Sequence, residues 1–514
     1  MYGPIHDQAD SGWFSRAGRP DSQWRVARAS LVADIQWGDV HVRRTSLRRT
    51  LIGALAALAI VAGACSSDRD DDPTATGDGD SGGTDTTAAP DDGVDGEFGD
   101  LESPCGEGDG EAAAGAATDQ GVTAEEVVIG YGDDAGFPTS PGLSHETSDA
   151  MKAMIDWCNE QGGIKGRQIV GRYYDAAITD VVNAMTQACD EVFMLVGEAW
   201  ALDSAQEETR LGCDLPAVPT YSVSPEFANA PLVYQSNPNP ADIYPAGAAA
   251  QLAELFPDEV TKASVMFGNF AATIDTKDKI VQAFPKFGWE FLDCPQEYNI
   301  AGEPDWKPFA QRLKDCGAEI VYYLGQPYPN MQNLLDDAAQ VDYRPVWVVD
   351  VNAYLQSFAD WNTTGNGDNV YMRTSFTPFE QADDSPATQQ YMDIVQGSGG
   401  DISQLAEQTT SSFLLWATAA KECGAELTRQ CVVDELSQIT SWTGGGLHQE
   451  TNPGENMPPE CFMILKLDGT SWVQAHPEEQ GEFVCNPDSN VELTGRVVDQ
   501  AELDENRVST KYLP

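Results

Sequence analysis

The chain has 514 residues, of which 82 are acidic and 29 are basic, so its formal net charge is -53. This length is enough for about two or three ordinary domains. Such a strong negative charge repels phosphate backbones and anionic lipid headgroups. The composition therefore argues against nucleic acid as a partner and against membrane adsorption through a basic patch.

A basic segment followed by a short apolar run lies near the N-terminus. Four arginines between positions 43 and 49 precede the run Leu51–Gly63, and small residues lead from this run to Cys65. The pattern is typical of an export signal, and the run is too short to span a bilayer of about 30 Å as a helix. The end of the run resembles the bacterial lipobox, in which the cysteine is lipidated. We expect residues 1–64 to be an export signal with an N-terminal extension from a mis-assigned start, and ordinary cleavage without lipidation is the alternative.

The segment after the signal is acidic and almost without large apolar residues. Residues 65–121 contain many Asp, Gly, Ser and Thr residues, and such a composition cannot offset the entropy of folding. We therefore expect a disordered acidic tether between Cys65 and the folded part. The string GDSGG at 79–83 matches a serine-protease motif, but no predicted strand or turn fixes its serine.

Short apolar runs alternate with helical patterns from residue 122 onward. We expect strands at 127–132, 169–175, 191–197 and 217–222, a helix that holds 151–158 and ends at Gly162, and helices at about 180–190 and 203–212. A second series has strands at 263–269, 289–294, 319–325 and 345–350, a helix at about 306–316, later helices at 385–397, 404–423 and 429–439, and a hairpin at about 461–476. This alternation predicts parallel sheets with helices on both faces.

The two series predict an α/β fold with two similar lobes. The first lobe is expected to hold residues 122–238 and about 374–450, and the second lobe residues 239–373 and about 451–490. Residues 491–514 would then form a C-terminal tail.

Ten cysteines follow Cys65, and an even number in an exported protein suggests disulfides. Neighbouring positions favour the pairs 189/213, 294/316, 423/431 and 461/485, which leaves 105/158, although the sequence alone leaves the connectivity open. No cysteine or histidine spacing typical of zinc is present, so we expect no metal and no cofactor. The candidates are Cys105, Cys158, Cys189, Cys213, Cys294, Cys316, Cys423, Cys431, Cys461 and Cys485.

Three strings resemble the solute-binding proteins of branched-chain amino-acid and amide ABC transporters. They are NEQGGIKGRQIVGRYYDAA at 159–177, WKPFAQRLKDCGAEIVYYLGQPYPNMQNLLDDA at 306–338 and SPEF at 224–227. The resemblance implies a type I periplasmic-binding-protein fold, in which two Rossmann-like lobes with parallel sheets are joined by three crossovers. It also implies that the lobes close on a small ligand.

Site residues follow from the resemblance and from the strand ends. In the family, hydroxyl groups and helix N-termini of the first lobe hold the ligand carboxylate, and an acidic residue of the second lobe holds the ammonium group. Asp350 stands near that acidic position, although it could instead cap a helix. Trp200 replaces part of the family's serine/threonine run, which argues against a simple amino acid as ligand, and it could instead be core. The candidates are Phe137, Trp200, Ala201, Ser204, Tyr221, Ser222, Gln326, Tyr328 and Asp350.

The resemblance implies a lipid-anchored, extracytoplasmic solute-binding protein of an ABC importer. Such a protein binds a small polar solute, hands it to permease subunits, is expected to act as a monomer and catalyses no reaction. The solute could be an amino acid, an amide, a urea-like compound or an aromatic compound. Two alternatives remain: a ligand sensor of the same fold, and an exported hydrolase, which the scarcity of histidine disfavours.

Overall fold

The computed structural model describes residues 96–108 and 119–513, which fall within one compact unit, Thr86–Pro514. The predicted export signal, Cys65 and most of the predicted tether lie outside the described residues. None of the described helices is long and apolar enough to cross a membrane.

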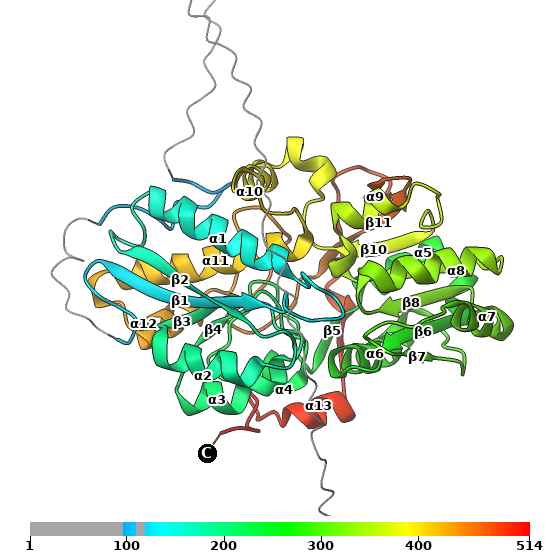
Figure 1. The fold of residues 1–514 in the computed structure, drawn as a ribbon, viewed down its shortest axis with the longest axis horizontal. Helices are drawn as coiled ribbons and strands as arrows, with labels where there is room; N and C mark the ends of the chain where they lie inside the picture. The colour runs from blue at the N-terminus through cyan, green and yellow to red at the C-terminus, as the bar shows by residue number, and fades with distance from the viewer. Residues whose placement is uncertain (1–95, 109–118, 514) are drawn as a thin grey trace, which may run out of the picture. The chain divides into compact units, whose positions relative to one another are not determined.

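The first lobe is built on a parallel sheet with the strand order β2-β1-β3-β4. The helix α11 packs against α1 on one face of this sheet, and α2 and α3 lie on the other face (Figure 1). The elements of the lobe are β1 (Glu126–Asp133), α1 (His145–Glu160), β2 (Gln168–Asp175), α2 (Val181–Glu191), β3 (Met194–Glu198), α3 (Glu207–Gly212), β4 (Ala217–Val218), α4 (Pro225–Ala228), α10 (Pro386–Gly397), α11 (Gln404–Cys423) and α12 (Arg429–Leu436).

In the helix α1, the residues that the sequence places on one helical face are the ones that pack in the core. Met151, Met154, Ile155 and Cys158 recur at the spacing of one helical face, and all four side chains are buried in the core of the first lobe. The helix α11 is buried on nearly every side, and Ser403 caps its start by accepting a hydrogen bond from the backbone N–H of Ala406 at 3.0 Å.

Part of the predicted tether is folded, so the prediction for 65–121 is wrong at 96–108. Phe98 is fully buried, and the backbone N–H of Asp100 donates to the carbonyl of Gly445 at 2.9 Å. A disulfide joins Cys105 to Cys158 of α1. One buried aromatic side chain and one covalent link fix a segment whose acidic composition alone favours disorder.

The second lobe is built on a mixed sheet with the strand order β12-β11-β10-β9-β8-β6-β7, in which β13 also pairs with β11. The core on one face contains side chains of α5 and α6, and the core on the other face contains side chains of α7, α8 and α9. The elements are α5 (Gly247–Leu255), β6 (Ala263–Gly268), α6 (Ala271–Ala283), β7 (Gln296–Tyr298), α7 (Lys307–Cys316), β8 (Ile320–Leu324), α8 (Gln332–Gln340), β9 (Val346–Val349), α9 (Gln356–Trp361), β10 (Val370–Thr374), β11 (Cys461–Asp468), β12 (Ser471–His476) and β13 (Val484–Cys485).

Two predicted strands differ from the structure. Residues 289–294 form only one bridge, from Phe291 to Ala263, and the strand that pairs with β6 is β7, which begins at Gln296. The indole of Trp289 is buried and donates to the carbonyl of Ala249 at 3.0 Å. The strand predicted at 217–222 ends after Val218.

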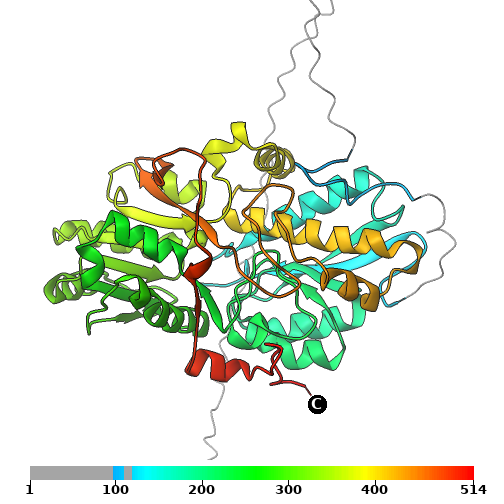
Figure 2. The same cartoon turned by 180° about the vertical axis from the view of Figure 1, so that it is seen from behind.

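The chain passes between the lobes three times, after α4, after β10 and after α12. A C-terminal segment, residues 490–513, also contacts both lobes, and we call it the strap (Figure 2). Its strand β14 (Asn490–Glu492) pairs with β5 (Ile243–Pro245), and its helix α13 (Arg496–Ala501) contacts α4 of the first lobe and α6 of the second. Ion pairs fix it at Arg496–Asp275 (2.6 Å), Arg507–Asp242 (2.6 Å) and Lys511–Glu226 (2.7 Å).

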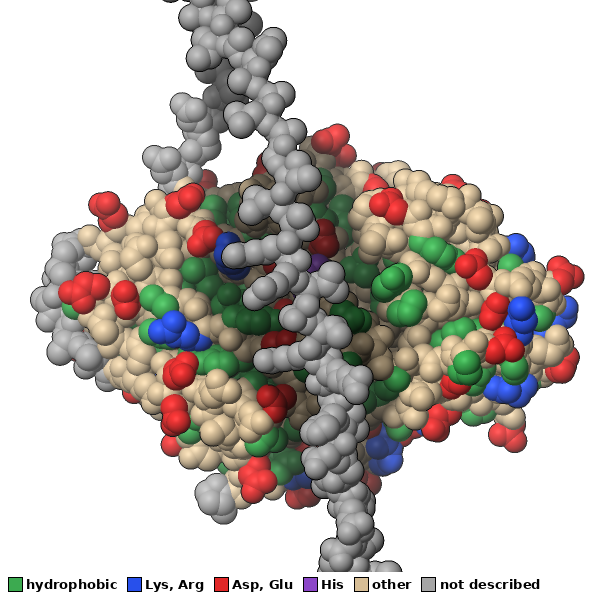
Figure 3. Space-filling model, in the orientation of Figure 1, with side chains coloured by type: hydrophobic (Ala, Val, Ile, Leu, Met, Phe, Trp, Pro, Cys, Tyr) green, Lys and Arg blue, Asp and Glu red, His purple; other side chains and the backbone are tan. Residues whose placement is uncertain are grey.

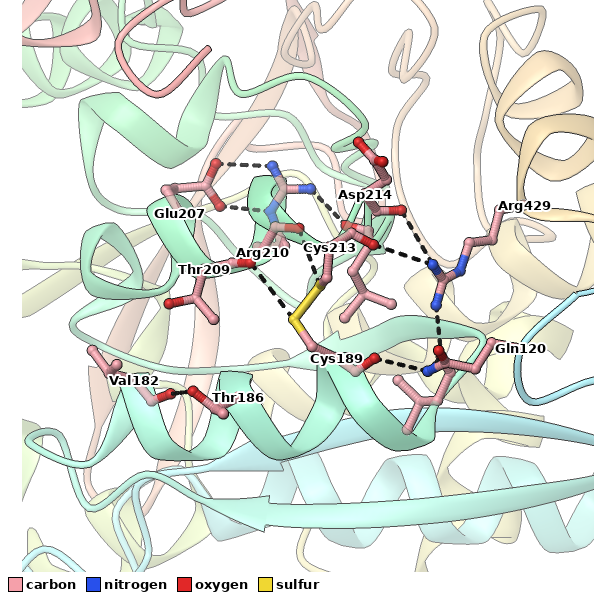
Figure 4. Close-up of a disulfide and its surroundings, with 12 residues drawn as sticks. Gln120, Val182, Thr186, Cys189, Glu207, Thr209, Arg210, Cys213, Asp214 and Arg429 are labelled. Atoms are coloured by element: carbon pink, nitrogen blue, oxygen red, sulfur yellow. Dashed lines mark hydrogen bonds and ion pairs between the residues drawn. A yellow bond between two sulfur atoms is a disulfide. The ribbon is translucent and has the colours of Figure 1, made fainter. Parts of the chain in front are cut away.

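Disulfides join the four pairs favoured by sequence neighbourhood, 189/213, 294/316, 423/431 and 461/485, and also the remaining pair, 105/158. The bond between Cys189 and Cys213 ties the end of α2 to the end of α3 (Figure 4). Close to it, the buried Arg210 makes two hydrogen bonds to the carboxylate of Glu207, at 2.6 and 2.8 Å. The guanidinium of Arg429 donates to backbone carbonyls nearby, including that of Phe193 at 2.7 Å. The disulfide therefore lies among arginine side chains whose hydrogen bonds are made within the protein.

Candidate functional site

A cavity of about 280 Å³ lies between the two lobes. Its walls are the carboxyl ends of parallel strands from both sheets, which is where open α/β sheets bind their ligands. All three crossovers contribute, through Asn237–Asn239, Thr374–Ser375 and Pro459. On the face drawn in Figure 3, hydrophobic side chains are visible between the lobes on either side of the grey atoms, and acidic side chains are spread over both lobes.

Five of the nine predicted ligand-binding residues line this cavity. Ala201, Tyr221 and Ser222 follow β3 and β4 of the first lobe, and Gln326 and Asp350 follow β8 and β9 of the second. The early end of β4 is what frees Tyr221 and Ser222 from the sheet to face the cavity.

The other four predicted residues do not line the cavity. Trp200 is 1% exposed, packs in the core of the first lobe, and donates its indole N–H to the carbonyl of Tyr174 at 3.3 Å. Tyr328 is 62% exposed on the surface. Phe137 and Ser204 are half-buried away from the cavity.

The reason for the burial of Trp200 is the geometry of the turn after β3. The backbone N–H of Ala201 donates to Oδ2 of Asp134 at 2.7 Å, and the N–H of Ile178 donates to Oδ1 of the same residue at 2.5 Å. This buried carboxylate fixes the turn, so that Ala201 faces the cavity and the indole of Trp200 faces the core. Burial raises the pKa of Asp134 to about 6.

The hydroxyl groups of the first-lobe wall already have acceptors within the protein. Tyr221 donates its hydroxyl proton to the carbonyl of Ala199 at 2.8 Å, and Ser222 donates to Oε1 of Gln235 at 2.6 Å. Each hydroxyl has one proton, so in this structure both offer acceptor lone pairs to a ligand. Neither Tyr221 nor Ser222 therefore has a hydroxyl proton left for a ligand carboxylate.

Asp350, Arg373 and Tyr322 form a polar cluster on the second-lobe side of the cavity. The parallel strands β9 and β10 pair Val349 with Met372, which places Asp350 beside Arg373 at the carboxyl edge of the sheet. Oδ1 of Asp350 lies 3.9 Å from Nε of Arg373 and accepts the hydroxyl proton of Tyr322 at 2.7 Å. Burial raises the pKa of Tyr322 well above its usual value, so that hydroxyl keeps its proton. Asp350 precedes a short 3-10 turn, but its side chain does not cap that turn.

Arg373 is held by further contacts on the same wall. Its Nη1 donates to the carbonyl of Pro245 at 3.0 Å, and its guanidinium carbon lies 5.2 Å from the ring centroid of Tyr244 and 5.6 Å from that of Phe462. Its side chain is 19% exposed. The aromatic rings and the carbonyl fix the direction of the guanidinium while part of it stays open to the cavity.

Lys279 of α6 is the third charged residue of the lining. It is 2% exposed, and its Nζ donates to the carbonyl of Pro240 in the first crossover at 3.0 Å. Burial lowers the pKa of Lys279 to about 8. The ammonium group thus links the second lobe to a crossover next to the cavity.

Several polar atoms of the cavity lining are buried without a hydrogen-bond partner among the described residues. They are Oδ1 of Asn237, Oη of Tyr244, Nε of Arg373 and Oε1 of Gln404, the first residue of α11. Buried polar atoms are normally paired, so this group indicates a place where a ligand or ordered water supplies the missing partners. Within residues 96–108 and 119–513, no group of His, Cys, Asp and Glu is arranged to hold a metal ion.

Sequence reasoning missed Arg373, Lys279, Tyr244 and Phe462, which all line the cavity. The available signal for Arg373 was a single arginine inside the apolar string VYMRT. Recognising this string as a strand beside β9 would have placed Arg373 next to Asp350.

Comparison with known proteins supports the same architecture. The model of the periplasmic binding protein family matches residues 108–471, which is more than half of the chain. A search of curated protein sequences finds no match.

Solved structures with the same fold include three informative ones. The isoleucine complex of the branched-chain amino acid transporter substrate binding protein LivJ from Streptococcus pneumoniae has 14% identity and a TM-score of 0.57, and the match covers 70% of this chain and 100% of that one. The leucine binding protein LivK from Thermotoga maritima has 15% identity, a TM-score of 0.58, and coverage of 70% and 99%. A fatty acid ABC transporter substrate-binding protein from Thermomonospora curvata has 13% identity, a TM-score of 0.55, and coverage of 73% and 96%.

At these identities the solved structures show the fold, which is that of a type I periplasmic binding protein with two α/β lobes. The match to the family model shows that the chain is a member of this family, because the match runs through both lobes and through the crossovers that line the cavity. The chain belongs to the periplasmic binding protein family.

Proposed function

We propose that this chain is an extracytoplasmic solute-binding protein of an ABC importer, which binds one small solute in the cavity between its lobes. The observation that carries this proposal is that both sheets and all three crossovers contribute to one cavity. A solute bound there contacts both lobes, so its binding favours the conformation in which the lobes are closed. Permease subunits would recognise that conformation.

The solute is proposed to contact Ala201, Tyr221 and Ser222 of the first lobe and Gln326 and Asp350 of the second, all of which line the cavity. The proteins of similar fold are described as binding isoleucine, leucine or fatty acid. These solutes share a carboxylate and an apolar body. For this chain we propose a small solute that fits the cavity of about 280 Å³.

The lipid anchor and the monomeric state belong to the same proposal. Cys65 follows an export-signal pattern and would carry the lipid, which would keep the protein at the outer face of the membrane. A mass increase confined to the N-terminal cysteine of the processed protein would support lipidation, and its absence would contradict it.

A hydrolase is the weaker alternative. His448 accepts the hydroxyl proton of Ser411 at its Nε2 (2.8 Å), while its Nδ1–H donates to the carbonyl of Gln449 (2.8 Å). This arrangement resembles a nucleophile with its base, but Ser411 is fully buried and neither residue lines the cavity. Burial lowers the pKa of His448 to about 4, and Trp442 donates its indole N–H to Ser411 at 3.0 Å. The pair fits a packed polar contact of the first-lobe core.

A thermal-shift screen of the full chain tests the proposal. The panel contains amino acids, amides, urea compounds, aromatic acids and fatty acids. A solute at 100 times its dissociation constant stabilises the folded state by about 2.7 kcal/mol. We expect at least one solute to raise the unfolding midpoint, and a panel without any such solute, on folded protein, would contradict the proposal. A ligand sensor would give the same shift, but it would not support uptake of the solute by cells that carry the permease.

A further inference from the structure

The cavity lining carries a net positive charge, although the whole chain has a formal charge of -53. Its charged side chains are Asp350, Arg373 and Lys279, which sum to +1 when Lys279 is protonated. Carboxylates near the cavity, such as Asp134, are engaged by backbone N–H groups. A cationic cavity in an acidic protein favours an anionic ligand.

The rest of the lining is largely apolar. Leu143, Ile178, Phe270, Ile300 and Leu405 face the same space as Arg373 and come from both lobes. These side chains can bury the hydrocarbon body of a ligand, and burial of apolar surface is the main source of affinity in such pockets. The ligand body is therefore apolar.

Asp350 is poorly placed to hold a ligand ammonium group. It accepts a hydrogen bond from Tyr322 at 2.7 Å and lies 3.9 Å from the guanidinium of Arg373. An ammonium group placed at Asp350 would lie next to Arg373 and would be repelled by it. Asp350 thus offsets part of the positive charge of Arg373.

Arg373 is the strongest donor that remains for a carboxylate. Its planar guanidinium matches a carboxylate, it is oriented by the rings of Tyr244 and Phe462, and part of its side chain is exposed to the cavity. The hydroxyl groups of Tyr221 and Ser222 donate to protein acceptors instead.

We propose that the ligand is a small carboxylic acid with an apolar body and without an ammonium group, and that Arg373 of the second lobe binds its carboxylate. This inference rests on the proposed function, because it names the solute class for the same cavity.

The test is a calorimetric titration of the full chain with two matched sets of ligands. One set is 4-methylpentanoate, leucine and 4-methylpentanamide, and the other is 3-phenylpropanoate, phenylalanine and 3-phenylpropanamide. Within each set the body is constant and only the polar end changes. We expect at least one acid to bind more tightly than its amino acid and its amide by at least about tenfold, because the charged hydrogen bond to Arg373 is lost or opposed in the others.

Variants assign the effect to Arg373. Arg373→Met should weaken binding of the acid by at least about tenfold, and Arg373→Lys should restore part of the loss, because the charge remains without the planar geometry. The matched control is Arg344→Met, which removes an exposed arginine of the same lobe and should leave the affinity unchanged.

Asp350→Asn separates the two possible ligand classes. Under the proposal it should tighten binding of the acid by about threefold or more, because a negative charge beside the bound carboxylate is removed. If Asp350 instead held a ligand ammonium, the same variant would weaken binding of the amino acid.

Three results would overturn the inference: an amino acid or an amide that binds as tightly as its acid, an Arg373→Met protein that is folded and binds the acid normally, or no binding by either acid. The wider solute screen then decides the proposed function. If another solute binds, only the inference fails, and if none binds, both fail.

Discussion

Replacing Glu198 with Gln should stabilise the protein at pH 8 and leave its stability almost unchanged at pH 5. Glu198 ends β3, is 1% exposed, and has no hydrogen-bond partner for either carboxyl oxygen among the described residues. Burial raises its pKa from 4.5 to about 8, while the charge of Arg210 opposes the rise. The folded protein therefore holds this proton over a pH range in which the unfolded chain has lost it.

The magnitude follows from the pKa difference. Each pKa unit corresponds to about 1.4 kcal/mol, so a group shifted from 4.5 to about 8 destabilises the folded state by about 4 kcal/mol at pH 8 and by less than about 1 kcal/mol at pH 5. Stability is lost as the pH rises, because the folded state binds more protons than the unfolded state. Gln cannot ionise and resembles the protonated carboxyl group, so the variant avoids this loss.

The assay is urea unfolding of the full chain with intact disulfides, at pH 5, 6, 7 and 8, for the wild type, Glu198→Gln and the exposed control Glu208→Gln. The difference in unfolding free energy between Glu198→Gln and wild type should grow by about 3 kcal/mol from pH 5 to pH 8. Other buried carboxyl groups titrate in both proteins and largely cancel. A difference that is constant with pH, or equal to that of Glu208→Gln, would refute the reasoning.

Three further predictions concern stability and binding. Replacing Cys189 and Cys213 together with Ser opens a link between residues 24 positions apart and should lower the unfolding free energy by about 3 kcal/mol, measured by urea unfolding; an unchanged midpoint would contradict the role of this disulfide. Arg507→Ala removes the partner of Asp242 and should cost about 1–3 kcal/mol in the same assay, and equal stability would show that the strap contact is weak. The affinity for a carboxylic acid should fall as the pH rises through about 8, because Lys279 loses its proton there and the cavity loses a positive charge. Burial lowers the pKa of Lys279 although the charges of Asp275, Asp242 and Asp203 oppose this shift. Calorimetry should show the pH dependence in the wild type and not in Lys279→Gln.

The fold was predictable where the sequence pattern is local. Runs such as 169–175 and 319–325 are apolar enough to be read as strands, and the residue spacing in α1 gives its buried face. The strand β10 was missed because the polar residues Arg373 and Thr374 interrupt its short apolar pattern. The folded segment at 96–108 was missed because its order comes from the distant partners Cys158 and Gly445.

The sequence predicted those site residues that directly follow a strand and face the cavity. Tyr221 and Asp350 follow strands and line the cavity, whereas Trp200 also follows a strand but turns into the core. That direction depends on the buried carboxylate of Asp134, which sequence spacing does not reveal. The partnership of Asp350 with Arg373 needs the strand order, because it joins two segments that are neighbours only in the sheet.

The most direct test of the central claim, that a solute binds between the lobes, is a calorimetric titration of variants that fill the cavity from each side. Ala201 of the first lobe and Ala272 of the second both line the cavity, and Ala271 is the exposed neighbour of Ala272 outside it. With the solute that gives the largest thermal shift, Ala201→Trp and Ala272→Trp should each weaken binding by at least about tenfold, because a large side chain takes the space of the ligand. Ala271→Trp should bind like the wild type. Wild-type affinity in both cavity variants would contradict the claim.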